Sequence, residues 1–417
     1  MKKIFVLILI FISTFTFVGC KSGFKEVKIK ESANFKYINH IELPSEEKQY
    51  LSLDKKDATT YNNFAFKSFS KIYSDKTNNF YSPASLYMAL AMIAEGADGT
   101  SLEEIKALLG NMSYIKNTNK LLYSNNYYKN DKGEASISNS YWINLDINVK
   151  DEYINTLNDY YFAEGFKCKF DNEAKSNMAK WVNNNTKGLL DAKESDFEGL
   201  EDMKLCVINT IYFDNKWYVE YKTSDTKTDK FYIGESSIDC SFMYHSIGSV
   251  YYANDKYSSV SDSFHNGNSI TYILPNEGID IKDIINDIDF KNNDDYYDKG
   301  FYTVKLYVPK FKYNVRMDLK ETLMTLGVNE VFSRLDANLS KISDTPLYLD
   351  QITQGAGIEL NETGVKAAAF TKGMTGAKSA DEPRKIIEFR LNRPFIYYIS
   401  DSNGCILFMG SIDNPNK

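Results

Sequence analysis

The chain has very little histidine and none of the short motifs that mark common catalytic sites. Its 417 residues include three histidines: His40, His245 and His265. There is no HExxH, no GxSxG, no phosphate-binding glycine loop and no EF-hand pattern. His245 and His265 could meet a serine and an aspartate only through the fold, and the sequence gives no support for that. We therefore predict that the protein is not an enzyme and holds no metal and no cofactor.

Clustered basic charge and cysteine pairs are also lacking. The net charge is −7, and a nucleic-acid-binding surface would need clustered positive charge, so we expect no nucleic-acid partner. The cysteines after residue 20 show no CxxC pair and no metal-ligand spacing. We expect no structural disulfide among Cys168, Cys206, Cys240 and Cys405.

A long apolar run is present at the N-terminus. Residues 4–18 follow two lysines and have the length of an export-signal core, which is short for a membrane-spanning helix. The run ends at Phe17-Val18-Gly19-Cys20, which resembles the bacterial lipobox, although that motif prefers leucine where Phe17 stands. The resemblance implies a signal peptide over residues 1–19 and a lipid on Cys20 that anchors the exported chain to a membrane. Simple secretion and a retained span are the alternatives.

Residues 20–56 are polar and charged, without sustained periodicity. This composition predicts a tether that holds the folded body on the order of tens of ångströms from the lipid. No shift in composition follows residue 57, so we predict one domain over residues 57–417.

Helical patterns dominate the first part of this domain. Apolar residues at helical spacing predict a helix from Asp57. Ser82 followed by Pro83 is typical of a helix start, and the apolar stretch that follows predicts a buried helix. A second, amphipathic helix is predicted from Ser101, with Glu103 and Glu104 in its first turn.

Strand patterns lie mostly later in the chain. They include Val207–Phe213, Ile396–Ile399 and an alternating piece over residues 311–315. Early helices and later strands favour an α+β fold over alternating βαβ units.

The segment from Glu359 to Pro394 suits both a strand and an exposed loop. Beyond Gly364, its small residues alternate with larger or charged ones, as they would in a strand with a small buried face. The stretch from Gly376 to Pro383 instead reads as a polar loop. From the residues alone, an ordinary surface loop is an equal alternative.

Several motifs in order resemble the serpin (serine protease inhibitor) family, over about residues 57–417. The first is NFYSPASLYMALAMIAEGADGTSLEEI, beginning at residue 79, and the last is FRLNRPFIYYISDSNGCILFMGSIDNP over residues 389–415. Between them, residues 160–190, 205–221 and 304–332 resemble further parts of the family in the same order. The resemblance implies the serpin fold, with large mixed β-sheets, surrounding helices and an exposed reactive-centre loop at about residues 362–386.

In this family a protease cleaves the loop, and the cleaved loop inserts into a sheet and distorts the bound protease. Such loop insertion is a known switching transition. Glu362 and Gly364 match the family's hinge acid and hinge glycine, whereas Val365 stands where threonine or serine is commoner. The small hinge run is matched by Ala367, Ala368 and Ala369.

Phe370 departs from the family, which prefers a small residue there too. Because it shares its parity with Lys366 and Lys372, we expect it to point outward after insertion. The inward set, from Val365 to Thr375, carries no charge and no proline. We therefore predict an inhibitory serpin. A non-inhibitory binding or structural protein on the same fold is the alternative.

The scissile bond is expected about sixteen residues beyond the hinge acid, and this count from Glu362 gives Lys378, followed by Ser379. The alternative is Arg384, followed by Lys385, which would need a longer inserted segment. A basic residue before the bond implies a trypsin-like serine protease as the partner, held in a covalent acyl complex by a monomeric inhibitor.

Supporting positions follow from the same resemblance. Ser82, Ser85 and Asn209 match a polar cluster beneath the sheet, called the shutter, where Gln354 replaces a common histidine. Trp217 matches the tryptophan of the breach, where the hinge enters the sheet. Without the resemblance, each would be interpreted as a helix cap or a core side chain.

Overall fold

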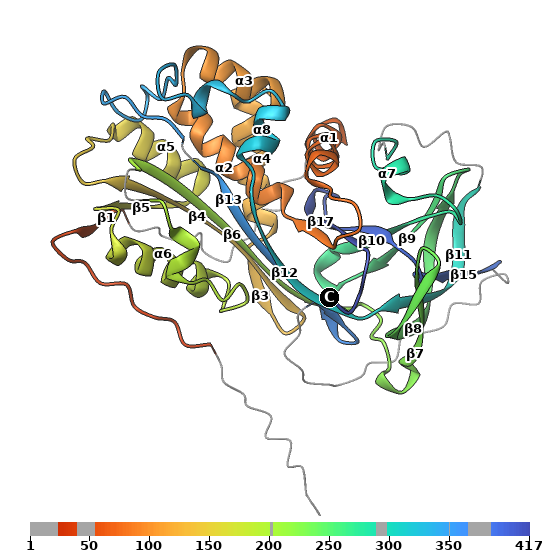
Figure 1. The fold of residues 1–417 in the computed structure, drawn as a ribbon. Helices are drawn as coiled ribbons and strands as arrows, with labels where there is room; N and C mark the ends of the chain where they lie inside the picture. Colours follow the sequence, from red (N-terminus) through yellow and green to blue (C-terminus); the bar gives the residue numbers. More distant parts are fainter. Residues whose placement is uncertain (1–23, 40–54, 201–202, 289–297, 350, 366–384) are drawn as a thin grey trace, which may run out of the picture.

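The computed structural model describes residues 24–39, 55–200, 203–288, 298–349, 351–365 and 385–417 (Figure 1). These residues form two large mixed sheets with helices around them, which confirms the predicted α+β fold. The first sheet has the strand order β1 (Phe35–Asn39), β5 (Ala163–Cys168), β4 (Gly133–Asn144), β6 (Leu205–Lys216), β14 (Gly364–Val365), β13 (Thr353–Asn361) and β12 (Phe311–Asp318). The short strand β3 (Tyr128–Asn130) also pairs with β4.

The second sheet carries the C-terminal strands. Its order is β15 (Ile386–Arg390), β11 (Asp298–Pro309), β8 (Ser236–Ala253), β9 (Tyr257–Ser263), β10 (Ser269–Pro275), β16 (Phe395–Ser400), β17 (Ile406–Ile412) and β2 (Asn79–Tyr81), and β7 (Lys227–Ile233) pairs with β8. A single large hydrophobic core joins the inner faces of both sheets to the helices.

The helices gather mainly on one side of the first sheet, while α6 lies on its other face (Figure 1). Their bounds are α1 (Lys55–Ile72), α2 (Pro83–Gly96), α3 (Gly99–Leu109), α4 (Met112–Asn125), α5 (Asp151–Tyr161), α6 (Asn172–Asn185), α7 (Ile281–Ile284) and α8 (Lys320–Thr325). None of the helices in the described ranges is both long and apolar enough to cross a membrane.

The predicted start of the buried helix is confirmed in atomic detail. The Ser82 side chain caps α2 by accepting the backbone N–H of Ser85, and Pro83 is the first helical residue. Nearly every residue of α2 is buried, as its uniformly apolar sequence predicts.

Helix α3 begins two residues earlier than predicted, so Glu103 and Glu104 do not lie in its first turn. The Glu104 carboxylate instead accepts the backbone N–H groups of Asn329 and Glu330, both at 2.7 Å. The prediction was wrong in this detail because that carboxylate satisfies backbone donors of another segment rather than those of its own helix.

The predicted tether is wrong where the structure describes it. Residues 24–39 lie on the folded body, and Phe35–Asn39 forms β1, which pairs antiparallel with β5 at the edge of the first sheet. Phe35 is fully buried and stacks on Phe166 with ring centroids 5.5 Å apart. A polar composition hid this strand, because Phe35 and the partly buried Tyr37, which packs on Phe166, form too short an alternation to detect.

The residues before β1 are attached to α6. The side-chain amide of Asn184 accepts the Val27 N–H and donates to the Val27 carbonyl, both at 2.9 Å. The Ser32 hydroxyl donates to Glu173 at the other end of the helix, at 2.9 Å. This N-terminal segment therefore runs along α6 and holds it from one side.

A second, smaller hydrophobic core lies beneath α6. It joins Phe35 and Phe166 to residues of the helix, of the strands below and of the connecting segments: Ile29, Trp142, Cys168, Phe170, Ala174, Met178, Trp181, Val182, Leu200 and Met203. The four cysteines after residue 20 are free, and three of them are buried.

Replacing Phe35 by alanine is expected to lower the free energy of unfolding by about 3 kcal/mol, because it leaves a cavity between Phe166 and Trp142. The matched control is Phe24→Ala, whose side chain is 40% exposed and which should change the free energy by less than about 0.5 kcal/mol. Urea unfolding followed by fluorescence measures both. Equal effects of the two changes would contradict the structural role of β1.

Candidate functional site: the turn between β13 and β14

The predicted hinge lies in a tight turn that joins β13 to β14. Glu362 and Thr363 form the turn, and Gly364 and Val365 then pair with β13 on one side and with β6 on the other. Within the described residues, β14 is two residues long and lies between two long strands. Among the described residues, β6 and β13 form no ladder with each other directly.

The three carbonyl groups of this turn are bound by the chain that follows β6. Trp217 donates its indole N–H to the Asn361 carbonyl at 2.9 Å and its backbone N–H to the Thr363 carbonyl at 3.2 Å. The Tyr221 backbone N–H donates to the Glu362 carbonyl at 3.2 Å. Trp217 is itself fully buried and stacks on Phe264, so the turn rests on a rigid aromatic surface.

Glu362 is held by a cation and a hydroxyl. Lys310 lies 2.9 Å from one carboxylate oxygen and 3.1 Å from the other, and the Thr226 hydroxyl donates at 2.9 Å. Burial of the carboxyl group opposes ionisation, but the hydrogen bonds from Lys310, from its own backbone and from Thr226 hold the pKa of Glu362 below its ordinary value.

Gly364 allows the closest approach of two strands in this region. A Cβ atom at Gly364 would lie 2.0 Å from the backbone oxygen of Asn215, which is far inside contact distance. Any other residue would therefore push β14 away from β6. Val365, the next residue, is 4% exposed and belongs to the main core.

The buried polar cluster contains three of its four predicted members. Gln354 accepts the Ser82 N–H at 2.7 Å and donates to the Ser82 carbonyl at 2.9 Å, so β13 is bonded to the start of α2. The Ser82 hydroxyl accepts the Ser85 N–H and donates to the Leu407 carbonyl at 2.7 Å. All three predicted members are less than 7% exposed.

Asn209, the fourth predicted member, bonds elsewhere. Its amide donates to the Asn139 side chain of β4 and lies 3.7 Å from the Met88 sulfur of α2. Its buried carbonyl oxygen makes no hydrogen bond in the structure. A buried amide oxygen without a partner costs free energy unless a water molecule satisfies it.

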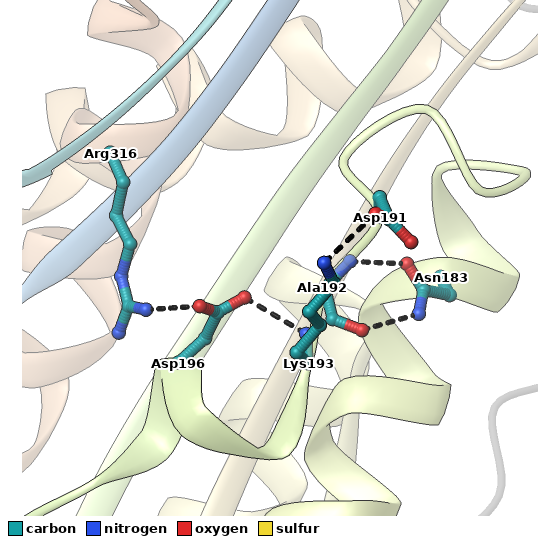
Figure 2. A network of polar contacts seen from close by, with 6 residues as sticks. All are labelled: Asn183, Asp191, Ala192, Lys193, Asp196 and Arg316. Carbon is teal, nitrogen blue, oxygen red and sulfur yellow. Dashed lines mark hydrogen bonds and ion pairs between the residues drawn. The ribbon is translucent and has the colours of Figure 1, made fainter.

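A segment that the sequence analysis did not identify as functional crosses the first sheet near β14. Residues 187–197, here called the crossing segment, follow α6 and reach β12 through an ion pair between Asp196 and Arg316 (Figure 2). Figure 2 also shows Asn183 of α6, whose side chain bonds both backbone groups of Ala192, at 2.7 and 2.8 Å.

The crossing segment also contacts three further strands, β4 and β6 on one side of β14 and β13 on the other. Lys187 pairs with Glu134 of β4 and lies over the ring of Tyr212 on β6, 4.9 Å from its centroid. Leu190 lies over Gly355 of β13. The segment therefore spans from β4 to β12, above the place where β6 and β13 are held apart.

His245 does meet an aspartate in space. Its Nε2 atom lies 3.0 Å from the Asp262 carboxylate, but the two side chains are 7% and 3% exposed. The third member of the group is Tyr221, which stacks on the imidazole and donates to Asp262 at 2.9 Å. This group is sealed beneath the turn and offers no site for a substrate. Across the described ranges, no cluster of three or more acidic, histidine or cysteine side chains could hold a metal.

Other predicted positions lie outside the described residues. These are Cys20, Ala367, Ala368, Ala369, Phe370, Lys378, Ser379 and Arg384. Lys385 is described and exposed, immediately before β15.

The site thus combines a large mixed sheet, a two-residue strand held between two long strands and a turn bound on all three carbonyls. This is the architecture of the serpin class. The sequence model described as "Serpin (serine protease inhibitor)" matches residues 59–415, and the chain belongs to that family. Serpins in general act on serine proteases as inhibitors rather than as enzymes.

Known proteins agree with this assignment. An uncharacterised serpin-like protein of Methanosarcina acetivorans is 29% identical over 381 residues, covering 86% of this chain and 88% of its own. Neuroserpin of Mus musculus is 28% identical over 366 residues, covering 81% of this chain and 86% of its own. The crystal structure of the thermophilic serpin Tengpin in its native state superposes with a TM-score of 0.76 at 27% identity, covering 91% of this chain and all of Tengpin.

Sequence reasoning located Glu362, Gly364, Val365 and Trp217 but missed the groups that hold them. Lys310 follows Pro309 at the end of a strand, and because it is 52 residues from Glu362 in the sequence, no local pattern connected the two. Thr226 and Tyr221 carried no signal either, because the Thr226 hydroxyl and the Tyr221 N–H meet Glu362 only through the fold.

Replacing Glu362 by glutamine is expected to destabilise the native state by about 1 kcal/mol at pH 7, since it removes the charge that Lys310 meets. Because folding lowers the pKa of Glu362, this stabilisation is complete above the ordinary carboxyl pKa of about 4.3 and is lost as the pH falls through the folded value. The difference between the two proteins should therefore shrink below about pH 4.

The control for this change is Glu359→Gln, which removes an exposed ion pair with Lys312. Melting temperatures measured from pH 7 to pH 3.5 follow all three proteins. A constant difference between Glu362→Gln and the parent over that range would contradict the role of the charge.

Proposed function

We propose that the protein inhibits trypsin-like serine endopeptidases as a suicide substrate, with cleavage after Lys378 and insertion of the cleaved loop between β6 and β13. The protease serine attacks the Lys378 carbonyl carbon, the bond to Ser379 breaks, and the amino group of Ser379 leaves with the proton. The observation that carries the proposal is β14, a two-residue strand already paired with both neighbours.

The register of β14 supports one path for the proposed insertion. Val365 pairs with Asn215 on β6 and with Leu360 on β13, both antiparallel. Continued in the same register, the chain would place Thr375 opposite Leu205, the first residue of β6. The nine residues of β13 and the twelve of β6 could thus pair with one inserted strand.

Small hinge residues fit the inward face of that path. Ala367 would face Phe213 and Ile358, two side chains of the main core. Because paired residues in an antiparallel ladder share a face, the other odd-numbered positions would point to the same core. None of these positions is charged, so insertion would bury no ion.

Phe370 would fit on the outward face. In this register it lies opposite Thr210 of β6 and Gly355 of β13. A Cβ atom at Gly355 would have only Leu190 of the crossing segment near it, at 3.5 Å. The space above Gly355 could therefore accept a phenyl ring, which explains how the hinge tolerates a large residue there.

Lys366 would find opposite charges on both sides. The same register places it opposite Asp214 of β6 and Glu359 of β13. Opposite charges that face each other across neighbouring strands each contribute about 0.2–1 kcal/mol. The charge pattern of the hinge is therefore compatible with insertion.

The length of the segment supports Lys378 as the residue before the bond. In the same register Lys378 lies three residues past Thr375, just beyond the end of β6. Arg384 would leave six further residues outside the sheet, and cleavage after Lys372 would leave the lower part of β6 without a partner. A lysine before the bond suits a protease with an acidic specificity pocket.

The proposed location is a membrane surface outside the cell, reached by export and a lipid on Cys20. Phe24, the first residue described on the domain, stands only four positions after Cys20. The lipid would then lie within about 14 Å of Phe24, so the domain sits beside the membrane and not at the end of a long tether.

Incubation with trypsin is expected to give a covalent complex at the summed mass of the two proteins, stable to boiling in detergent. Lys378→Ala should abolish this band, while Arg384→Ala should leave it unchanged. Sequencing of the released C-terminal peptide should begin at Ser379. Cleavage after Lys378 without any complex would support the non-inhibitory alternative and sink the proposal.

Two adjacent alanines test the direction of insertion. Ala369→Lys should convert the inhibitor to a substrate, because the charge would be buried against Ile211 and Ala356 in the main core. Ala368→Lys is the matched control, since it would face outward, and it should keep at least about half of the complex formation. The stoichiometry of inhibition measures both, and equal losses would show that the register is different.

A further inference from the structure

One buried carboxyl group lies directly after β17 and has an oxygen without a hydrogen-bond partner. Asp413 is 8% exposed, and its Oδ2 atom accepts no hydrogen bond from the described residues. No cation among the described residues forms an ion pair with it. Burying a charged carboxylate in this way costs far more free energy than burying the neutral acid. The surroundings of Asp413 therefore favour its protonated form.

Two further carboxyl groups come from separate segments. Asp75 follows the end of α1, and Asp280 stands immediately before α7. Burial and the charges of Asp413, Asp75 and Asp280 all raise the pKa of Tyr73, so this side chain faces all three acids. Its hydroxyl donates to Asp75 at 3.3 Å. Asp75, Asp280 and Asp413, here called the acid cluster, therefore lie around one tyrosine.

The other groups around the acid cluster do not neutralise Asp413. Among the described residues, Lys282 is the one cation that pairs with a member of the cluster, and it lies 3.3 Å from Asp280. Burial and, to a smaller extent, the charge of Asp413 raise the pKa of Tyr313 on β12, so this phenol also faces the buried acid. Asp413 is thus surrounded by two carboxyl groups and two phenols, without a cation of its own.

These surroundings change how Asp413 binds a proton. Burial, followed by the charge of Asp75, raises the pKa of Asp413 to about 7, although a hydrogen bond with Ser411 lowers it. An aspartate in an unfolded chain has a pKa of about 3.9. Between these two values the folded chain holds more protons than the unfolded chain. The stabilisation is therefore complete below about pH 4 and is lost as the pH rises through the folded value.

The acid cluster lies where the end of β17 is attached to the connection between α1 and β2. In that connection, the Asn78 side chain accepts the backbone N–H groups of Asp413 and Asn414, at 2.8 and 2.9 Å. It also donates to the Asn414 carbonyl at 2.8 Å. Asp75 belongs to the same connection, so a charge on Asp413 would repel the segment that holds it.

We propose that Asp413 is a proton-dependent clamp. In its neutral form it keeps the end of β17 against the connection between α1 and β2, and its ionisation as the pH rises loosens this contact by repulsion from Asp75. The proposal does not depend on the proposed inhibitory function, because no residue of the acid cluster belongs to the turn between β13 and β14 or to the loop that follows it.

The test compares the parent with Asp413→Asn, which keeps the size of the side chain and cannot ionise. Asp344→Asn is the control, because the Asp344 side chain is 92% exposed. Urea unfolding is measured from pH 5 to pH 8.5. Relative to Asp413→Asn, the unfolding equilibrium constant of the parent is expected to rise at least about tenfold over this range, because each pH unit below the folded pKa changes it by up to about tenfold. The Asp344→Asn protein should follow the parent.

Two further measurements separate local repulsion from a general effect of pH. Asp75→Asn should reduce the loss of stability, because it removes a charge that opposes the ionisation of Asp413. Amide hydrogen exchange of residues 74–79 and 409–414 should be faster in the parent than in Asp413→Asn at pH 8.5 and equal in the two proteins at pH 5. A ratio of unfolding constants that stays the same from pH 5 to pH 8.5 would overturn the proposal, and so would a changing ratio without the local difference in exchange.

Discussion

The described part of the structure depends on the two-residue ladder that β14 forms with its neighbours on both sides. Gly364 and Val365 pair with both β6 and β13. Each of these strands is therefore one strand spacing from β14 at this end of the sheet. Strand edges carry unpaired N–H and C=O groups, and the proposed insertion would pair those of β6 and β13 with one further strand. The crossing segment and the Asn209 oxygen that has no hydrogen-bond partner lie in the same region of the sheet, at β6 and β13.

The turn between β13 and β14 is fixed by groups on three different segments. Its carbonyls are bound by residues that follow β6, its carboxylate is bound by Lys310 and Thr226, and its glycine permits contact with Asn215. Such a turn can act as a pivot, because its position is determined while the chain after it can change partners. The proposed insertion requires that a kinetic barrier, and not the lowest free energy, preserves the native state.

Much of the fold could be predicted, because it is encoded by local patterns and by ordered motifs. The cap at Ser82, the buried helix α2 and the long strand β6 have clear signals in the chain. Strand β1 could not be predicted, since the inward residues Phe35 and Tyr37 form only a short alternation within a polar stretch. The crossing segment could not be predicted either, because Lys187, Leu190 and Asp196 acquire their partners from strands distant in sequence. Asn209 was assigned to the shutter by position, but its bonding is decided by Asn139.

The attachment of the N-terminal segment determines how the domain bears a load. Any pull on the chain before Phe24 first meets the paired hydrogen bonds between Val27 and Asn184, at the C-terminal end of α6. These bonds, the Ser32–Glu173 contact and the β1–β5 ladder are met in succession along the chain. Force from that end is therefore delivered to the helix that leads into the crossing segment, and not to the turn at β14. A pull on the N-terminal segment would therefore act on the crossing segment, which lies over the first sheet at β6 and β13.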